Sequence, residues 1–187
     1  MDALNQLVSL SWLVFWILWI GAAIYSKQLN HDRIGPRWPR LVFFMAIVIL
    51  LLNSFAKAVN LNYKIDHHHQ ALRVLGLLLF YAGLAVAIWA RRHLGNSWGV
   101  PMSTKKDTKL VTSGPYSLVR NPIYSGFLLA IVGSALVNNF SWLIFFLLAA
   151  AFVAYSSLEE EKNLARQFPK TYPAYKRRTK MLIPYVF

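Results

Sequence analysis

The stretch PIYSGFLLAIVGSALVNNFSWLIFFLLAAAFVAYSSL, residues 122–158, contains no charged residue. It consists of two apolar runs, 122–137 and 141–158, separated only by an Asn-Asn-Phe turn. Since about 20 mostly apolar residues cross the hydrocarbon layer as a helix, each run predicts a transmembrane helix, although the first is rather short. The tight turn predicts that the two helices form an antiparallel hairpin.

Three more runs of this kind precede the hairpin, at 7–26, 41–59 and 72–90. The chain of 187 residues is 57% apolar and only 14% charged, whereas a typical soluble chain has about 25% charged residues. Five buried helices of a soluble protein would need polar faces, which these runs do not have. The sequence therefore predicts an all-α, polytopic membrane protein with about five transmembrane helices.

The basic residues predict the orientation of these helices, because cytoplasmic loops are enriched in Lys and Arg. On one face lie only three basic residues: Lys57 near the end of the second run, Lys64 between the second and third runs, and Arg73 at the start of the third. The other 17 of the 20 basic residues lie in three segments on the opposite face, 27–40, 91–120 and 162–180. We therefore expect the N-terminus outside and the C-terminus inside. The membrane would be that of a bacterial or archaeal cell, or the endoplasmic reticulum of a eukaryote.

The net charge of +13 has two possible explanations. A basic soluble domain would indicate nucleic acid, but basic loops between apolar runs indicate contact with anionic lipid headgroups, and we expect no nucleic-acid partner. The chain contains no cysteine, which excludes disulfides, thiol nucleophiles and cysteine-bound metals. The first run has neither a basic start nor a cleavage signature, so we expect no signal peptide.

Two cytoplasmic segments are candidates for function. The loop 91–121 is too long for a simple connector, and the tail 159–187 is charged and amphipathic, with apolar and aromatic residues at helical spacing. We expect the fifth helix to extend into the cytoplasm, to break near Phe168 because Pro169 and Pro173 follow, and to give way to a short helix against the membrane face. The first three helices would occupy 1–90, and 91–187 would be one integrated domain containing the site.

The three glutamates of the chain, Glu159, Glu160 and Glu161, are consecutive at the inner end of the fifth run. Successive helical residues point about 100° apart, so at most two of them face one site. They could be a solvated stop signal paired with neighbouring Lys and Arg. The alternative is a site for a cation, including a cationic cofactor.

The loop ends in KLVTSGPYSLVRNPIYSG, residues 109–126. Asn121-Pro122 predicts a helix start with Asn as the cap and Pro in the first turn, where backbone donors favour an anion such as a carboxylate. Tyr116 and Tyr124 offer aromatic faces for stacking or for a cation. Gly126, Ala130 and Ser134 form a stripe of small residues suited to close helix packing. A capped helix with interfacial tyrosines would explain the segment without a ligand.

Three ordered motifs resemble one family of membrane enzymes. They are RRHLGNSWG (91–99), LVTSGPYSLVRNPIYSG (110–126) and EEKNLARQFPKTYPAYKRRTKMLIP (160–184), in roughly the C-terminal half of the chain. In this order they resemble the isoprenylcysteine carboxyl methyltransferase and phospholipid methyltransferase superfamily. The resemblance implies transfer of a methyl group from S-adenosylmethionine to a lipid or isoprenoid acceptor in the membrane.

The resemblance also implies roles for particular residues. In this family the loop and the tail hold the cofactor, and the matching positions here are Lys109, Leu110, Val111, Tyr116, Asn121, Pro122, Tyr124 and Glu160. Glu161 and Arg120 are the candidate catalytic residues, and Glu161 would be the base if the acceptor is an amine, which must lose a proton. A carboxylate acceptor would need no base.

Two positions depart from the family pattern. The His that usually follows the motif Arg is Asn121 here, which keeps a hydrogen-bonding side chain but removes a titratable imidazole. The prenylcysteine enzymes carry an Arg at the position of Ser156. This second departure leaves the methyl acceptor open.

Other functions have weaker support in the sequence. Sterol-type reductases that use NADPH have a similar C-terminal pattern but are usually much longer. A non-enzymatic scaffold that binds anionic lipid would need only the basic face, and a transporter would show intramembrane ion pairs or broken helices. Residues 67–69 are three consecutive histidines, which rarely all reach one metal ion, so we expect a solvated turn and no metal site.

Overall fold

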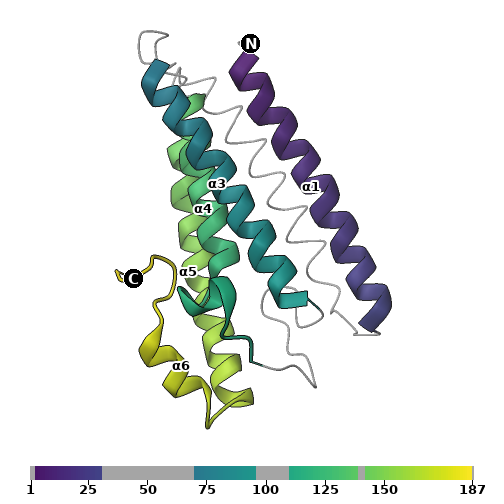
Figure 1. Ribbon diagram of the computed structural model, residues 1–187, viewed down its shortest axis with the longest axis vertical. Helices are drawn as coiled ribbons and strands as arrows, with labels where there is room; N and C mark the ends of the chain where they lie inside the picture. Colours follow the sequence, from purple (N-terminus) through teal and green to yellow (C-terminus); the bar gives the residue numbers. More distant parts are fainter. Residues whose placement is uncertain (1–2, 31–69, 96–109, 139–141, 187) are drawn as a thin grey trace. The chain divides into compact units, whose positions relative to one another are not determined.

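The computed structural model describes residues 3–30, 70–95, 110–138 and 142–186 (Figure 1). These residues form α-helices, one short 3-10 helix and connecting turns, with no strand in the described ranges. In chain order the elements are α1 (Ala3–Asn30), α3 (Gln70–Leu94), η3 (Gly114–Ser117), α4 (Pro122–Val137), α5 (Trp142–Gln167) and α6 (Tyr172–Arg178). The predicted helical membrane fold is confirmed. The run 41–59 and the histidines 67–69 lie outside the described residues.

Three described helices are long and apolar enough to cross a membrane: Ala3–Ala22 of α1, then α3 and α5, while α4 is a shorter apolar helix. Large apolar side chains remain exposed on them, including Leu18 at 66%, Leu78 at 65% and Leu147 at 66%. Apolar surface of this kind is unfavourable in water but suits lipid contact. The number of five spans and the inside–outside orientation stay predictions.

The chain divides into two compact units. The first contains residues 1–80 and 131–146, and here the indole of Trp12 donates a hydrogen bond to Ser134 Oγ (3.0 Å) and its ring lies edge-on to Phe80. α3 and α4 approach closely in this unit, because a Cβ on Gly133 would lie 2.4 Å from the Phe80 backbone nitrogen. Close backbone approach of this kind requires glycine.

The second unit contains residues 81–130 and 147–187. A Cβ on Gly126 would lie 2.5 Å from the Gly83 carbonyl oxygen and 2.7 Å from the Ala87 nitrogen, so α3 and α4 also touch through their backbones here. Gly126, Ala130 and Ser134 are all buried, and the predicted packing role of this small-residue stripe is confirmed.

The tail follows the expected course. α5 continues to Gln167, well past the apolar run, and residues 168–171 form a turn before α6. Figure 1 shows the chain turning back after α5, so that α6 lies beside the end of α5. The expected break near Phe168 is confirmed, because the helical bond from the Phe168 nitrogen to the Leu164 oxygen (2.8 Å) is followed by Pro169.

Candidate active site

The end of the long loop pairs with the end of the tail. Val119 and Lys180 form a parallel bridge, the Arg120 nitrogen donates to the Lys180 oxygen (2.8 Å), and the Asn121 nitrogen donates to the Met181 oxygen (3.1 Å). The Asn121 side-chain amide also donates to the Met181 oxygen (3.4 Å), toward the tail. This pairing brings together the loop 91–121 and the tail 159–187, which carry sequence motifs. We call their described residues the loop–tail region.

Proline at the first position of α4 matches the predicted helix start. The Asn121 carbonyl accepts the first helical bonds, from the backbone nitrogen and the hydroxyl of Ser125, both at 3.1 Å. The single proton of this hydroxyl is shared between the Asn121 oxygen and the closer Leu182 oxygen (2.6 Å). The start of α4 is therefore tied to the tail as well as to its own helix.

The turn that carries Tyr116 is held from two sides. Gly114 has a φ of +60°, which favours glycine, and the His93 ring packs so closely that a Cβ there would lie 2.8 Å from it. His93 Nε2 also shares a hydrogen bond with Ser113 Oγ (2.9 Å). From the tail, the Tyr175 hydroxyl donates to the Tyr116 carbonyl oxygen (2.7 Å).

The three consecutive glutamates point to different partners. Glu159 pairs with Lys162 on the same exposed helix face (2.6 Å). Glu160 accepts a hydrogen bond from the Tyr124 hydroxyl (2.8 Å), which joins the start of α4 to the far part of α5. The two helices therefore run antiparallel there, as expected for a hairpin. Glu160 and Glu161 thus both have partners near the end of the loop. This agrees with the prediction that at most two of the three glutamates face one site.

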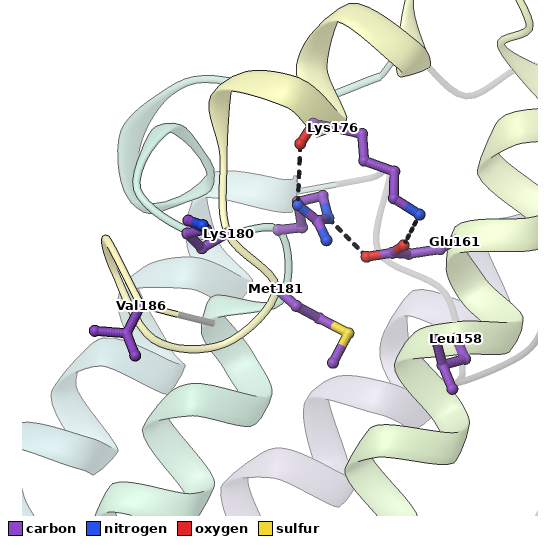
Figure 2. A pocket seen from close by; sticks show the side chains of 7 residues that line it. Leu158, Glu161, Lys176, Lys180, Met181 and Val186 are labelled. Atoms are coloured by element: carbon purple, nitrogen blue, oxygen red, sulfur yellow. Dashed lines mark hydrogen bonds and ion pairs between the residues drawn. The ribbon is translucent and has the colours of Figure 1, made fainter.

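Glu161 lies at the centre of an ion-pair cluster (Figure 2). Its Oε1 pairs with Arg120 Nε and its Oε2 with Lys176 Nζ, each at 2.6 Å. The side chains of Arg120 and Glu161 are only 10% and 8% exposed. Arg120 also donates to the carbonyl oxygens of Lys176 (3.3 Å) and Thr179. The cluster Arg120–Glu161–Lys176 therefore links the loop, α5 and α6; the catalytic roles of Glu161 and Arg120 stay predictions.

Buried phenols surround the ion-pair cluster and the Tyr116 turn. Burial raises the pKa of Tyr116 well above its ordinary value, and the Glu160 carboxylate raises it further. Burial also raises the pKa of Tyr172, with a further contribution from Glu161. Burial raises the pKa of Tyr175 to about 12, although the positive charge of Arg120 acts to lower it. These phenols are thus neutral at physiological pH. Tyr175 serves as a hydrogen-bond donor, and the three rings offer aromatic faces; none of them is a base.

Most of the residues predicted to bind the cofactor lie in this region. Tyr116, Asn121 and Pro122 are buried, Tyr124 pairs with Glu160, and the half-buried Leu110 and Val111 begin the described part of the loop. Lys109 lies outside the described residues.

Sequence reasoning missed other residues that shape the site. His93 and Ser113 fix the loop turn, and Tyr172, Tyr175 and Thr179 pack or bond behind it. The helical spacing of Tyr172 and Tyr175 in the tail predicted that they share a face, and it was the available signal for their burial.

Comparisons with known proteins found related sequences and a similar fold. Protein-S-isoprenylcysteine O-methyltransferase B of Arabidopsis thaliana is 28% identical over 151 residues, which cover 77% of this chain and 74% of that protein. The cobalt-zinc-cadmium resistance protein CzcN of Cupriavidus metallidurans is 38% identical over 160 residues, covering 83% of this chain and 65% of that protein. The solved structure of the eukaryotic intramembrane Ras methyltransferase, an isoprenylcysteine carboxyl methyltransferase, matches all of this chain and 69% of its own with a TM-score of 0.61. At 17% identity that likeness shows the fold alone.

The fold, the motifs and these relatives define the class: this is an integral membrane methyltransferase. The sequence model of the phospholipid methyltransferase family matches residues 71–171, more than half of the chain. The chain belongs to the phospholipid methyltransferase family.

Proposed function

We propose that the protein transfers a methyl group from S-adenosylmethionine to a lipid-like or isoprenoid acceptor at the cytoplasmic boundary of the membrane. The observation that carries the proposal is the pair of Tyr124 and Glu160, 2.8 Å apart, beside the buried Tyr116. A carboxylate with aromatic faces suits a cation. The basic residues concentrated in the loop and the tail support the cytoplasmic side.

The described residues fit the chemistry of this donor. S-adenosylmethionine carries a sulfonium and an ammonium group, for which Glu160, Tyr116 and Tyr124 are suitable partners. Asn121 and Pro122 begin α4, where helix donors favour a carboxylate. Leu110 and Val111 would line the pocket, and Lys109 is proposed with them from the sequence. The bound donor supplies an activated methyl group for an in-line displacement.

The task left to the chain is alignment, because donor and acceptor have to meet within about 3–3.5 Å. A carboxylate or thiolate acceptor needs no base. For an amine acceptor Glu161 is the proposed base, but both its oxygens accept from cations, so one ion pair would have to open. The geometry therefore favours an acceptor that is already deprotonated. The isoprenylcysteine relatives support an isoprenoid acceptor, whereas Ser156 differs from the Arg of those enzymes.

Binding of S-adenosylmethionine to the purified protein in detergent tests the donor. Glu160→Ala should weaken binding by about 10- to 100-fold, because hydrogen bonds to charged groups contribute about 1.5–3 kcal/mol. Glu159→Ala is the matched control, since the neighbouring carboxylate pairs with Lys162 on the exposed face, and it should bind as wild type. Equal affinity in all three proteins would contradict the proposal.

The acceptor requires a second measurement. Membrane lipids incubated with the protein and isotopically labelled S-adenosylmethionine are analysed by mass spectrometry. A labelled isoprenoid ester or a labelled phospholipid would support the proposed acceptor class and identify its member. Label confined to water-soluble products would exclude it.

A further inference from the structure

The tail carries a basic segment, residues 177–180, whose cationic side chains form no ion pair within the described residues. Arg177, Arg178 and Lys180 are all exposed. Each glutamate there already has a polar partner: Lys162 for Glu159, the Tyr124 hydroxyl for Glu160, and Arg120 with Lys176 for Glu161. The glutamates of the described residues therefore leave these three charges available to an external anion.

The residues that follow this basic segment are apolar and exposed. Ile183 is 54% exposed, Tyr185 88% and Val186 71%. Basic residues next to exposed aliphatic and aromatic side chains are typical of segments at the membrane–water interface, where the apolar parts enter the lipid and the charges meet headgroups. A soluble anion would not account for the apolar part.

A cavity of about 320 Å³ lies where the two kinds of side chain meet. Lys176, Lys180 and Arg120 line it together with Glu161, which gives three cations to one carboxylate, and Leu158, Met181 and Val186 form its apolar lining (Figure 2). Leu158 is the last residue of the fifth apolar run before the glutamates. The cavity is therefore at the level where α5 changes from apolar to charged sequence, as a headgroup site requires.

We propose that this cavity binds the phosphate of an anionic membrane phospholipid, with Lys180 as its main cationic contact and the acyl side against Leu158 and Val186. Lys176 contributes less, because its ammonium is already paired with Glu161. The bound lipid would hold the tail, and with it Tyr175 behind the Tyr116 turn, at the membrane surface. Arg120 and Glu161 of its lining are also the candidate catalytic residues, but lipid retention is measured without a methyl donor, so this proposal can fail while methyl transfer is observed.

Lipid retention by the full chain in native mass spectrometry tests this site without any methyl donor. The protein in detergent is offered equal amounts of dioleoyl phosphatidylglycerol and dioleoyl phosphatidylcholine, and the wild type should retain the anionic lipid preferentially. Lys180→Gln should lower that retention about fivefold, the effect of one Lys or Arg near an anionic surface. The Lys180 carbonyl that accepts from Arg120 is unaffected by this substitution.

Lys170→Gln is the matched control, since it removes one exposed charge from the turn before α6, away from the cavity lining, and it should retain lipid as wild type. Val186→Asn should also reduce lipid retention, because it removes part of the apolar lining. A site for inorganic phosphate alone would not predict this loss. Equal retention of the two lipids, equal loss in both lysine variants, or displacement of the lipid by equimolar inorganic phosphate would overturn the proposal. Thermal unfolding of each variant confirms that it is folded.

Discussion

The α3–α4 contact and the loop–tail region use opposite chemistry to bring segments together. Gly83, Gly126 and Ala87 let two helix backbones touch, so this contact depends on the absence of side chains. The loop–tail region instead depends on long side chains, since Arg120, Glu161 and Lys176 hold three segments through ion pairs. The difference predicts which kind of substitution each of the two regions tolerates. Added atoms should disrupt the first region, and removed atoms the second.

The largest expected effect comes from adding one methyl group to the helix contact. Gly126→Ala places a Cβ 2.5 Å from the Gly83 carbonyl oxygen, and backbone atoms cannot move aside as a flexible side chain would. We expect a loss of more than about 3 kcal/mol in the free energy of unfolding. Thermal unfolding in detergent measures it.

Gly21→Ala is the control for the same substitution in open space, because a Cβ at Gly21 of α1 meets nothing within 4 Å. This variant should be as stable as wild type or slightly more so, since alanine favours a helix over glycine by about 0.5–1 kcal/mol. Equal stability of Gly126→Ala and wild type would show that α3 and α4 are not held by backbone contact.

The next largest effect should come from removing atoms in the loop–tail region. Arg120→Ala leaves the Glu161 carboxylate, 8% exposed, with Lys176 alone, and frees the carbonyls of Lys176 and Thr179. Breaking one partner out of a buried pair costs about 3 kcal/mol, because a poorly compensated charge remains. Arg120→Ala, Glu161→Gln and the double variant form a cycle, measured by thermal unfolding. Strictly additive losses would contradict direct coupling of the two residues.

The sequence predicted the α3–α4 contact better than the contacts of the loop–tail region. The repeat of Gly126, Ala130 and Ser134 indicates a close helix contact directly, because small residues at four-residue spacing share one face of a helix. The apolar runs likewise predicted α1, α3, α4 and α5 to within a few residues at most ends. α5 continues for nine residues beyond its apolar run, an extension that only the tail pattern suggested.

The partners within the loop–tail region could not be predicted in this way. The order of the motifs, through the family resemblance, indicated that loop and tail meet. Nothing local in the sequence specifies that Arg120 pairs with Glu161 and not with Glu160, since these carboxylates differ only by about 100° around the helix. The contacts of His93 and Tyr175 join residues far apart in the chain, and such pairs depend on the path of the whole fold.

A smaller effect, confined to the loop, is expected at His93. His93→Ala removes the hydrogen bond to Ser113 and the ring that covers Gly114. One hydrogen bond contributes about 1 kcal/mol, so amide exchange at Tyr116, whose nitrogen donates to the Ser113 oxygen, should become about fivefold faster. In His93→Gln, which keeps a hydrogen-bond donor, the exchange rate at Tyr116 should lie between those of wild type and His93→Ala. Unchanged exchange in His93→Ala would show that the tail alone fixes this turn.

A further effect appears in alkaline solution and tests the contact of Tyr175 with the loop. Burial raises the pKa of Tyr175 to about 12, whereas a phenol in the unfolded chain ionises near 10. Between about pH 10 and 12 the folded protein therefore keeps a proton that the unfolded chain has released. The free energy of unfolding should be unaffected by this group below about pH 10 and should fall as the pH rises through that window.

Tyr175→Phe should flatten this fall without abolishing it, because the pKa values of Tyr116 and Tyr172 are raised as well. At neutral pH the same variant should be less stable by about 1 kcal/mol, since the Tyr116 carbonyl loses its donor. Tyr185→Phe is the control, as its phenol is 88% exposed, and it should leave the alkaline slope unchanged. If Tyr175→Phe and Tyr185→Phe gave the same slope as wild type, the Tyr175 phenol would not be buried in the loop–tail region, and the contrast with the helix contact would rest on the ion pairs alone.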